Sequence, residues 1–130
     1  MIPTAGQCFE LMERYGMLEN IKAHSIMVEK VANVLAREII KAGTVVSMPM
    51  ITAGALMHDI AKTPCLNTRQ DHALMGSEIC IMNHFEEIAG IVRGHVIIDG
   101  FDLETDVNET EIIYYADKRI NHDKLVSIEE

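Results

Sequence analysis

Histidine and aspartate residues occur in an order that could be used for metal chemistry. His58 and Asp59 are adjacent, His24 precedes them, and Asp117 follows near the end of the chain. Imidazole and carboxylate groups together suit divalent ions of the first transition row. A buried carboxylate without a partner is costly, so such a group normally neutralises, pairs or binds a metal. The four residues therefore indicate a shared metal site.

The spacing of apolar residues predicts that these polar groups face an interior. In a helix, residues i, i+3, i+4 and i+7 lie on one face. His24 shares such a face with Val28, and Asp117 lies between Ile113 and Ile120. Several helices therefore aim metal-competent side chains at one interior.

Separate structural roles are the alternative to a shared site. A single histidine on an apolar face is more often a hydrogen-bonded core residue, and Asp117 could simply pair with Arg93 or Arg119. His95 repeats the pattern, because it continues the apolar stripe that includes Val92. One cation would satisfy all of these inward-facing groups at once, and on that ground we predict the shared site.

The composition restricts the classes of protein. The chain has 130 residues, which fits one domain spanning 1–130. Its 11 Lys and Arg against 20 Asp and Glu give a net charge of −9. This charge disfavours general binding to nucleic acid or to acidic membranes, since both depend on clustered cations. Three cysteines without a Cys-x-x-Cys pair predict a reduced, cytoplasmic protein with neither a disulfide framework nor a thiolate zinc site.

The elements that must position these residues are predicted to be helices, in an all-α bundle of about six. The expected helices span 7–15, 21 to about 42, 47 to no later than 63, 71–83, 85–94 and 109–121. Asn20 and Asp71 are expected to cap two of them, because their side chains accept hydrogen bonds from first-turn amides. Gly43 is expected to end the second helix, and Pro49 to lie in the first turn of the third.

Two smaller expectations concern the core and short strands. Phe9 is expected in the core together with Leu11 and Met12. Residues 45–46 and 96–98 are candidate strands, but neither segment is long enough to build a sheet.

The ordered motifs resemble the HD-domain metal-dependent phosphohydrolases, which are named for an adjacent His-Asp pair. The matching strings are AGALMHDIAK (53–62), DHALMGSE (71–78), RGH (93–95) and YADK (115–118). They extend over a motif-bearing region of about 20–124. The family fold is a compact helical bundle, and small HDIG-type members are most similar, although position 61 is Ala rather than Gly.

The resemblance implies a set of metal ligands. The first ion would be held by His24, His58, Asp59 and Asp117. His72 and His95 occupy places where relatives with two metals carry further ligands, and Asp59 would then bridge the two ions. The implied cofactor is one or two divalent ions, of Mn, Fe, Ni, Co, Mg or Zn.

The resemblance also implies an activity. A metal-activated hydroxide would hydrolyse a phosphate ester or anhydride of a nucleotide or other small phosphorylated molecule, as a phosphomonoesterase or a phosphodiesterase/pyrophosphohydrolase. Asp59 would orient the hydroxide, and Lys62 would neutralise phosphate charge in catalysis. Arg69 and Arg93 are candidate phosphate-binding residues because of their charge type alone.

Two other functions remain open on the sequence. One is a non-catalytic sensor module that binds a metal or a nucleotide, and the other is a di-iron oxygenase on the same fold. Besides the small phosphorylated substrate, a second copy of the chain could be a partner, whereas a nucleic-acid duplex and a membrane are not expected.

Overall fold

The structure is a computed structural model, and it describes residues 1–66, 68–94, 108–121 and 124–125. Six helices lie in this part of the chain: α1 (Ala5–Arg14), α2 (Glu19–Lys41), α3 (Met48–Met57), α4 (His72–Met82), α5 (Glu86–Gly94) and α6 (Glu109–Lys118). A two-residue antiparallel pair, β1 (Ile120–Asn121) and β2 (Lys124–Leu125), follows α6. The prediction of an all-α bundle with about six helices is confirmed.

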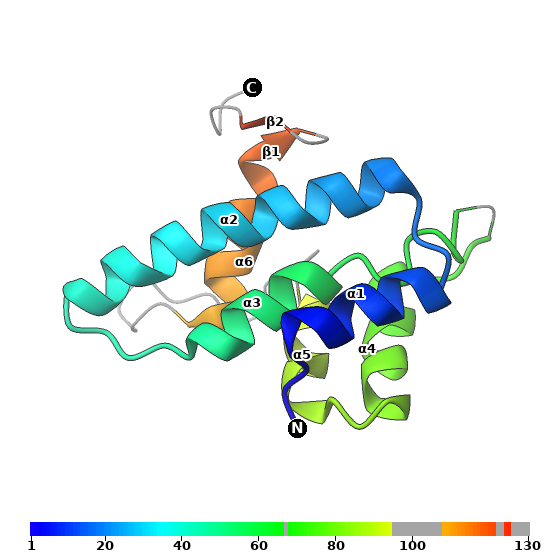
Figure 1. Ribbon diagram of the computed structural model, residues 1–130, viewed down its shortest axis with the longest axis horizontal. Coiled ribbons are helices and arrows are strands. Elements are labelled where there is room, and N and C mark those ends of the chain that lie inside the picture. Colours follow the sequence, from blue (N-terminus) through cyan, green and yellow to red (C-terminus); the bar gives the residue numbers. More distant parts are fainter. Residues whose placement is uncertain (67, 95–107, 122–123, 126–130) are drawn as a thin grey trace.

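Helix α3 lies at the centre of the bundle, where it contacts α1, α2, α5 and α6. The long α2 runs across α3 and α6, while α4 and α5 pack against each other on the opposite side (Figure 1). A helix that is apolar all round is normally buried. In agreement, most residues of α3 are buried, namely Ile51, Ala53, Gly54, Ala55, Leu56 and Met57.

A glycine lets two helices approach α3 closely. A Cβ atom on Gly54 would lie 2.7 Å from Cδ1 of Ile113 in α6 and 2.8 Å from Cγ2 of Ile91 in α5. Such contacts are far shorter than van der Waals separation, so these side chains occupy the space that a larger residue would need. The packing that brings α6 to the centre of the bundle therefore depends on this glycine.

Three helices end with a residue in the left-handed backbone conformation. Gly16, Gly43 and His84 have φ angles of 67°, 105° and 66° and follow the C-caps of α1, α2 and α4. After α2, Thr44 N donates to Ile39 O at 3.2 Å, and Gly43 N donates to Ile40 O at 3.0 Å. This is the Schellman pattern of hydrogen bonds. The predicted termination at Gly43 is confirmed.

Of the two N-caps predicted from the sequence, one is present in the structure and one is not. Ser47 and Asp71 cap α3 and α4 by accepting hydrogen bonds from first-turn amides, and the cap at Asp71 is confirmed. The cap predicted at Asn20 is wrong, because α2 begins at Glu19 with Leu18 as its N-cap and no side-chain cap. Leu18 N instead donates to Thr63 Oγ1 at 3.2 Å, so a tertiary contact replaces the local one.

Several boundaries and one core assignment also differ from the prediction. Helix α3 ends at Met57, within the predicted limit of 63, whereas α6 ends at Lys118 rather than 121, and 45–46 is not in a strand. Phe9 is 37% exposed, with the Lys22 ammonium 5.6 Å from the centre of its ring, so the ring is shielded by a cation and not by the core. The candidate strand at 96–98 lies outside the described residues. Each helix among the described residues is too short or too polar to traverse a lipid bilayer.

Candidate metal centre

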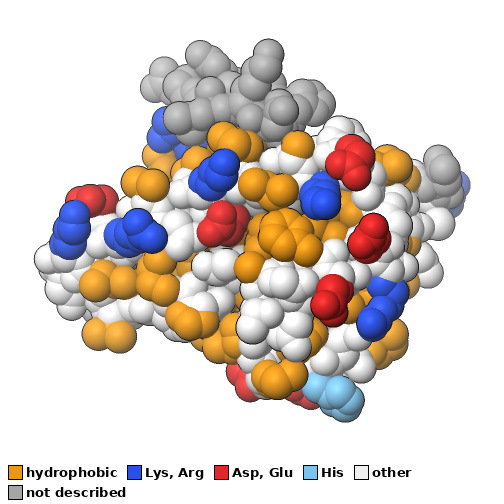
Figure 2. Space-filling model, viewed as in Figure 1, with side chains coloured by type: hydrophobic (Ala, Val, Ile, Leu, Met, Phe, Trp, Pro, Cys, Tyr) orange, Lys and Arg blue, Asp and Glu red, His pale blue; other side chains and the backbone are white. Residues whose placement is uncertain are grey.

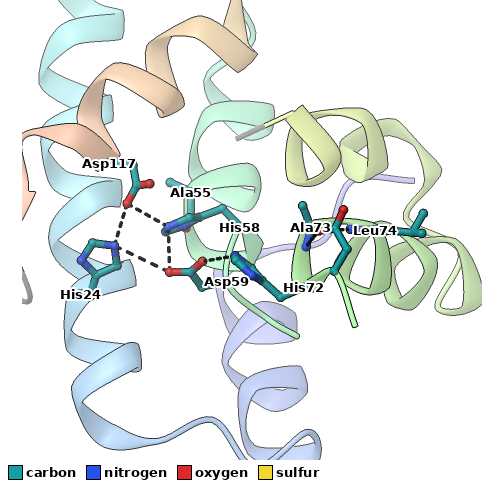
Figure 3. A network of polar contacts seen from close by, with 9 residues as sticks. His24, Ala55, His58, Asp59, His72, Ala73, Leu74 and Asp117 are labelled. Carbon is teal, nitrogen blue, oxygen red and sulfur yellow. Dashed lines mark hydrogen bonds and ion pairs between the residues drawn. The ribbon is translucent and has the colours of Figure 1, made fainter. Parts of the chain in front are cut away.

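Five of the six predicted ligands come from four separate parts of the bundle and point toward one another (Figure 3). His24 lies in α2, Asp117 is the penultimate residue of α6, and His72 is the first residue of α4. His58 and Asp59 come directly after the last residue of α3. The fold thus brings together residues that are far apart in the sequence.

The two distances from His58 suit ligands of a single cation, whereas His24 stands at hydrogen-bond distance from Asp117. His24 Nε2 lies 2.7 Å from Asp117 Oδ1 and 3.7 Å from Asp59 Oδ2. His58 Nε2 lies 3.2 Å from Asp59 Oδ2 and 3.4 Å from Asp117 Oδ1. Two ligand atoms about 2.1 Å from one ion, at an angle between 90° and 110°, would be about 3.0–3.4 Å apart. Imidazole nitrogen and carboxylate oxygen are also the donor types that such ions accept.

A backbone contact orients His58. Its Nδ1 donates to the carbonyl oxygen of Ala55 at 2.6 Å, and because a carbonyl can only accept, Nδ1 carries a proton. The other ring nitrogen, Nε2, is then directed at the two carboxylates. Metal-bound histidines are commonly held by this type of contact, which fixes both the tautomer and the ring orientation.

The turn after α3 explains why both residues of the adjacent pair face inward. Ile60 N donates to Met57 O and Lys62 N to Asp59 O, each at 3.0 Å, so the chain tightens to i→i+3 hydrogen bonds. His58 is fully buried and Asp59 is 4% exposed. A continued α-helix would separate neighbouring side chains by about 100° around its axis. The upper limit of 63 predicted for the third helix did not reveal this turn, which presents the pair.

The charges in the centre are strongly coupled. Burial alone would lower the pKa of His58, but the charges and hydrogen bonds of Asp59 and Asp117 raise that pKa to about 10. Burial alone would raise the pKa of Asp117, but hydrogen bonds from His24 and His58 hold that pKa well below its ordinary value. The Asp117 carboxylate thus stays ionised and attracts positive charge, which either a proton or a cation can supply.

His72 stands at the accessible edge of the centre. Its Nε2 lies 3.7 Å from Asp59 Oδ1, whereas His24 and His58 approach the other oxygen of the same carboxylate. The His72 side chain is 32% exposed, compared with 14% for His24. The structure therefore places His72 beside the group, in contact with a different oxygen. His95, the remaining predicted ligand, lies outside the described residues.

The predicted phosphate-binding residues are not part of this group. Lys62, Arg69 and Arg93 are exposed, and within the described part of the chain none of them forms an ion pair with the centre. Their phosphate-binding roles, and that of Lys62 in catalysis, stay predictions. Asp117 contacts His24 rather than Arg93 or Arg119, the partners considered for it as an isolated residue.

The comparisons with known proteins give one finding that bears on function. No family model and no solved structure matches the chain. A curated protein of Thermoplasma volcanium, named tRNA (cytidine(56)-2'-O)-methyltransferase, is 28% identical over 97 residues. The match covers 74% of this chain and 27% of the relative, so the chain spans about a quarter of that protein's length.

This match contradicts the predicted activity. The relative is named for methyl transfer to a ribose oxygen of tRNA, a different class of reaction from hydrolysis of a phosphate ester or anhydride. The prediction of a phosphohydrolase acting on a nucleotide is therefore wrong, and neither the sensor nor the oxygenase alternative gains support. The activity was inferred from a motif, and residues able to hold a metal do not specify a reaction. The resemblance to HD-domain proteins stays a prediction, because no family model tests it.

Proposed function

We propose that the chain is a helical domain that binds a divalent cation and serves the 2'-O-methylation of tRNA. The proposed cation binding is supported by the convergence of four ligand side chains from three segments of the chain. They are His24, His58, Asp59 and Asp117, with His72 available as a further ligand. The donor set suits Mn²⁺, Fe²⁺, Co²⁺, Ni²⁺ or Zn²⁺.

A bound cation would supply a compact positive charge that links distant parts of the chain. His24 belongs to α2, Asp117 to α6, and His58 and Asp59 to the turn after α3. An ion held by all of them would stabilise the folded chain, since the unfolded chain offers no assembled site. The domain would then be most stable when loaded with metal.

The methylation part of the proposal comes from the Thermoplasma relative. Because the match spans only 27% of that protein, we assign this chain an accessory role beside the catalytic part of a methylating enzyme. The proposal departs from the expectation, based on a net charge of −9, that the chain avoids nucleic acid. It also places the protein in the cytoplasm, where the three free cysteines would stay reduced.

Metal content and thermal unfolding test the cation centre. The purified chain is stripped with EDTA, dialysed and titrated with Mn²⁺ or Co²⁺, and bound metal is counted by mass spectrometry. We expect at least one tightly held equivalent and an unfolding temperature that rises with metal concentration. His24→Asn is expected to abolish both effects. A matched control is His84→Asn, because His84 is exposed and Asn tolerates its left-handed backbone conformation.

A methyl-transfer assay tests the accessory role. The chain is incubated alone with an unmodified tRNA transcript and S-adenosylmethionine that carries a tritiated methyl group. We expect the chain to bind the tRNA without transferring label. Stoichiometric or catalytic labelling of the tRNA would mean that the chain is itself the methylating enzyme, and would overturn the accessory role.

A further inference from the structure

Three basic residues and one valine form a row along the outer face of the C-terminal half of α2. Lys30, Val34, Arg37 and Lys41 stand at i, i+4, i+7 and i+11, the spacing of one helical face, and all four are exposed. We call these four residues the α2 stripe. Figure 2 shows Lys and Arg side chains along α2 on this side of the molecule, with Asp and Glu side chains among them. The stripe is notable because acidic residues outnumber basic ones in the chain as a whole.

Two cations of the stripe form no ion pair within the described part of the chain, although their charges act on Glu29. Lys41 pairs with Glu38 at 3.3 Å, but neither Lys30 nor Arg37 forms an ion pair with another described residue. Glu29, which lies next to Lys30 in the sequence, is half-buried and accepts a hydrogen bond from Asn33 Nδ2 at 2.6 Å. Burial raises the pKa of Glu29, and the charges of Lys30 and Arg37 act against this shift. The carboxylate therefore partly offsets the two cations, whose side chains face solvent.

The end of α2 next to the stripe presents an open surface. It combines two cations, one carboxylate and two apolar side chains: Val34, Arg37, Glu38, Ile40 and Lys41. Val34 is 62% exposed and Ile40 is 40% exposed. Cations beside accessible apolar surface suit a nucleotide unit, whose phosphate needs charge and whose sugar and base can cover hydrocarbon.

We propose that the α2 stripe is the surface through which this chain contacts the phosphate backbone of tRNA. The inference rests on the proposed role in tRNA methylation and names the surface that role requires. From Lys30 to Lys41 the helix rises about 16 Å, long enough to lie along several phosphates of one strand. The geometry is rigid, because Val28, Ala32 and Ala36 on the opposite face of α2 are fully buried in the bundle.

Binding of a fluorescently labelled, unmodified tRNA transcript tests the stripe. Fluorescence anisotropy gives the affinity of the full chain at several NaCl concentrations. With two or three phosphate contacts, the logarithm of the binding constant should fall with the logarithm of salt with a slope of about −2 to −3. We expect Arg37→Glu to weaken binding at least tenfold and to make the slope shallower by about one. The double variant Lys30→Glu/Arg37→Glu should not bind measurably.

Arg14→Glu is the control, because it makes the same change in charge on an exposed residue of α1. It also removes a hydrogen bond from Arg14 Nη1 to Asn83 Oδ1, so circular dichroism checks that both variants are folded. It should weaken binding less than twofold. Equal losses in Arg14→Glu and Arg37→Glu would mean that only net charge matters, and would overturn the stripe. Unchanged binding in Arg37→Glu would overturn it as well.

The two proposals fail in different ways. If the wild-type chain does not bind tRNA, the role in tRNA methylation fails together with the stripe. If it binds tRNA but is insensitive to the stripe variants, only the stripe is wrong. Vesicles containing phosphatidylserine serve as a second probe, and binding to these vesicles without binding to tRNA would identify the stripe as a membrane contact instead.

Discussion

The two faces of α2 differ in whether their charged side chains are buried and paired or exposed to solvent. On the inner face, the His24 side chain is 14% exposed and lies within 3.7 Å of two carboxylates. On the outer face, Lys30 and Arg37 are exposed and have no ion-pair partner in the described part of the chain. Burial requires charges to be matched within the protein, whereas solvent allows them to stay unmatched until a partner arrives. One helix can therefore organise an internal centre and present an external surface.

The net charge of the whole chain does not describe the local charge on one face of α2. A value of −9 averages over the whole chain, and part of the negative charge is buried in the centre with histidines around it. The outer face of α2 is locally basic. Local arrangement, and not the sum, decides what each face can bind.

Removing a carboxylate from the inner side should have the largest effect. Asp59→Asn keeps the shape of the side chain but removes the charge that faces His24, His58 and His72. We expect the affinity for Mn²⁺ to fall at least about 100-fold, because losing a direct metal ligand costs more affinity than losing a residue that only orients a ligand. Isothermal titration calorimetry measures the loss, and Glu13→Gln on the exposed side of α1 is the control. An unchanged affinity in the Asp59→Asn variant would remove Asp59 from the centre.

A substitution in the packing behind the centre should have the next largest effect, on the stability of the fold. Gly54→Ala places a methyl group within 2.8 Å of Ile91 and Ile113, and we expect it to reduce the free energy of unfolding by about 2 kcal/mol. Gly90→Ala in α5 is the matched control, because a Cβ atom there meets nothing within 4 Å. That variant should be neutral or more stable by up to about 1 kcal/mol. Urea unfolding of both variants would decide the matter, and equal stabilities would contradict the close packing.

Acidity should weaken cation binding at the inner face. Without metal, the pKa of His58 is raised to about 10, so its ring is protonated at neutral pH and binding must release that proton. The affinity should therefore fall about tenfold for each unit of pH lowered below 10, where one proton is displaced. In the metal-free chain, the protonated ring of His58 stabilises the folded state. This contribution is complete below about pH 6.5 and is lost as pH rises through about 10. Calorimetry in buffers of different ionisation enthalpy counts the protons, and finding none released would contradict the coupling.

A smaller effect is expected where α4 ends. His84 holds a left-handed backbone conformation, with φ of 66°, that costs a residue with a side chain about 1 kcal/mol. His84→Gly should raise the free energy of unfolding by about 0.5–1 kcal/mol, and His84→Ala should not. Thermal unfolding separates the two substitutions, and a less stable glycine variant would show that His84 makes a favourable contact.

The smallest effect on folding is expected at the outer face. Arg37→Glu should change the free energy of unfolding by less than about 0.5 kcal/mol, because Arg37 is exposed and forms no ion pair within the described part of the chain. Its metal affinity should also stay that of the wild type. A large loss of either property would mean that the two faces of α2 are not independent.

The parts of the fold that follow local rules were predictable from the sequence. The apolar spacing located six helices, and the ends at Asp71 and Gly43 follow from side-chain capping and from the freedom of glycine. The start of α2 was not predictable in this way, because Leu18 is held by a residue of a distant segment, Thr63. Phe9 was misplaced because periodicity does not reveal that a lysine can cover a ring.

The candidate site was predictable as a set of side chains but not as an arrangement. Polar residues on apolar stripes identified His24 and Asp117, yet no pattern in the sequence indicates the backbone contact from His58 to Ala55. The i→i+3 turn that points His58 and Asp59 inward was likewise hidden by the helical spacing. The reaction could not be derived from the ligand set, which explains why the predicted activity was wrong while its residues still converge.

Anomalous diffraction from crystals of the chain grown with Co²⁺ tests the cation centre most directly. We predict one strong peak at about 2.1 Å from His24 Nε2 and His58 Nε2 and from oxygens of Asp59 and Asp117. The peak should be absent in crystals of Asp59→Asn. Metal-free density at this position, with Co²⁺ present in the crystal, would contradict the account, and so would a peak held by other residues alone.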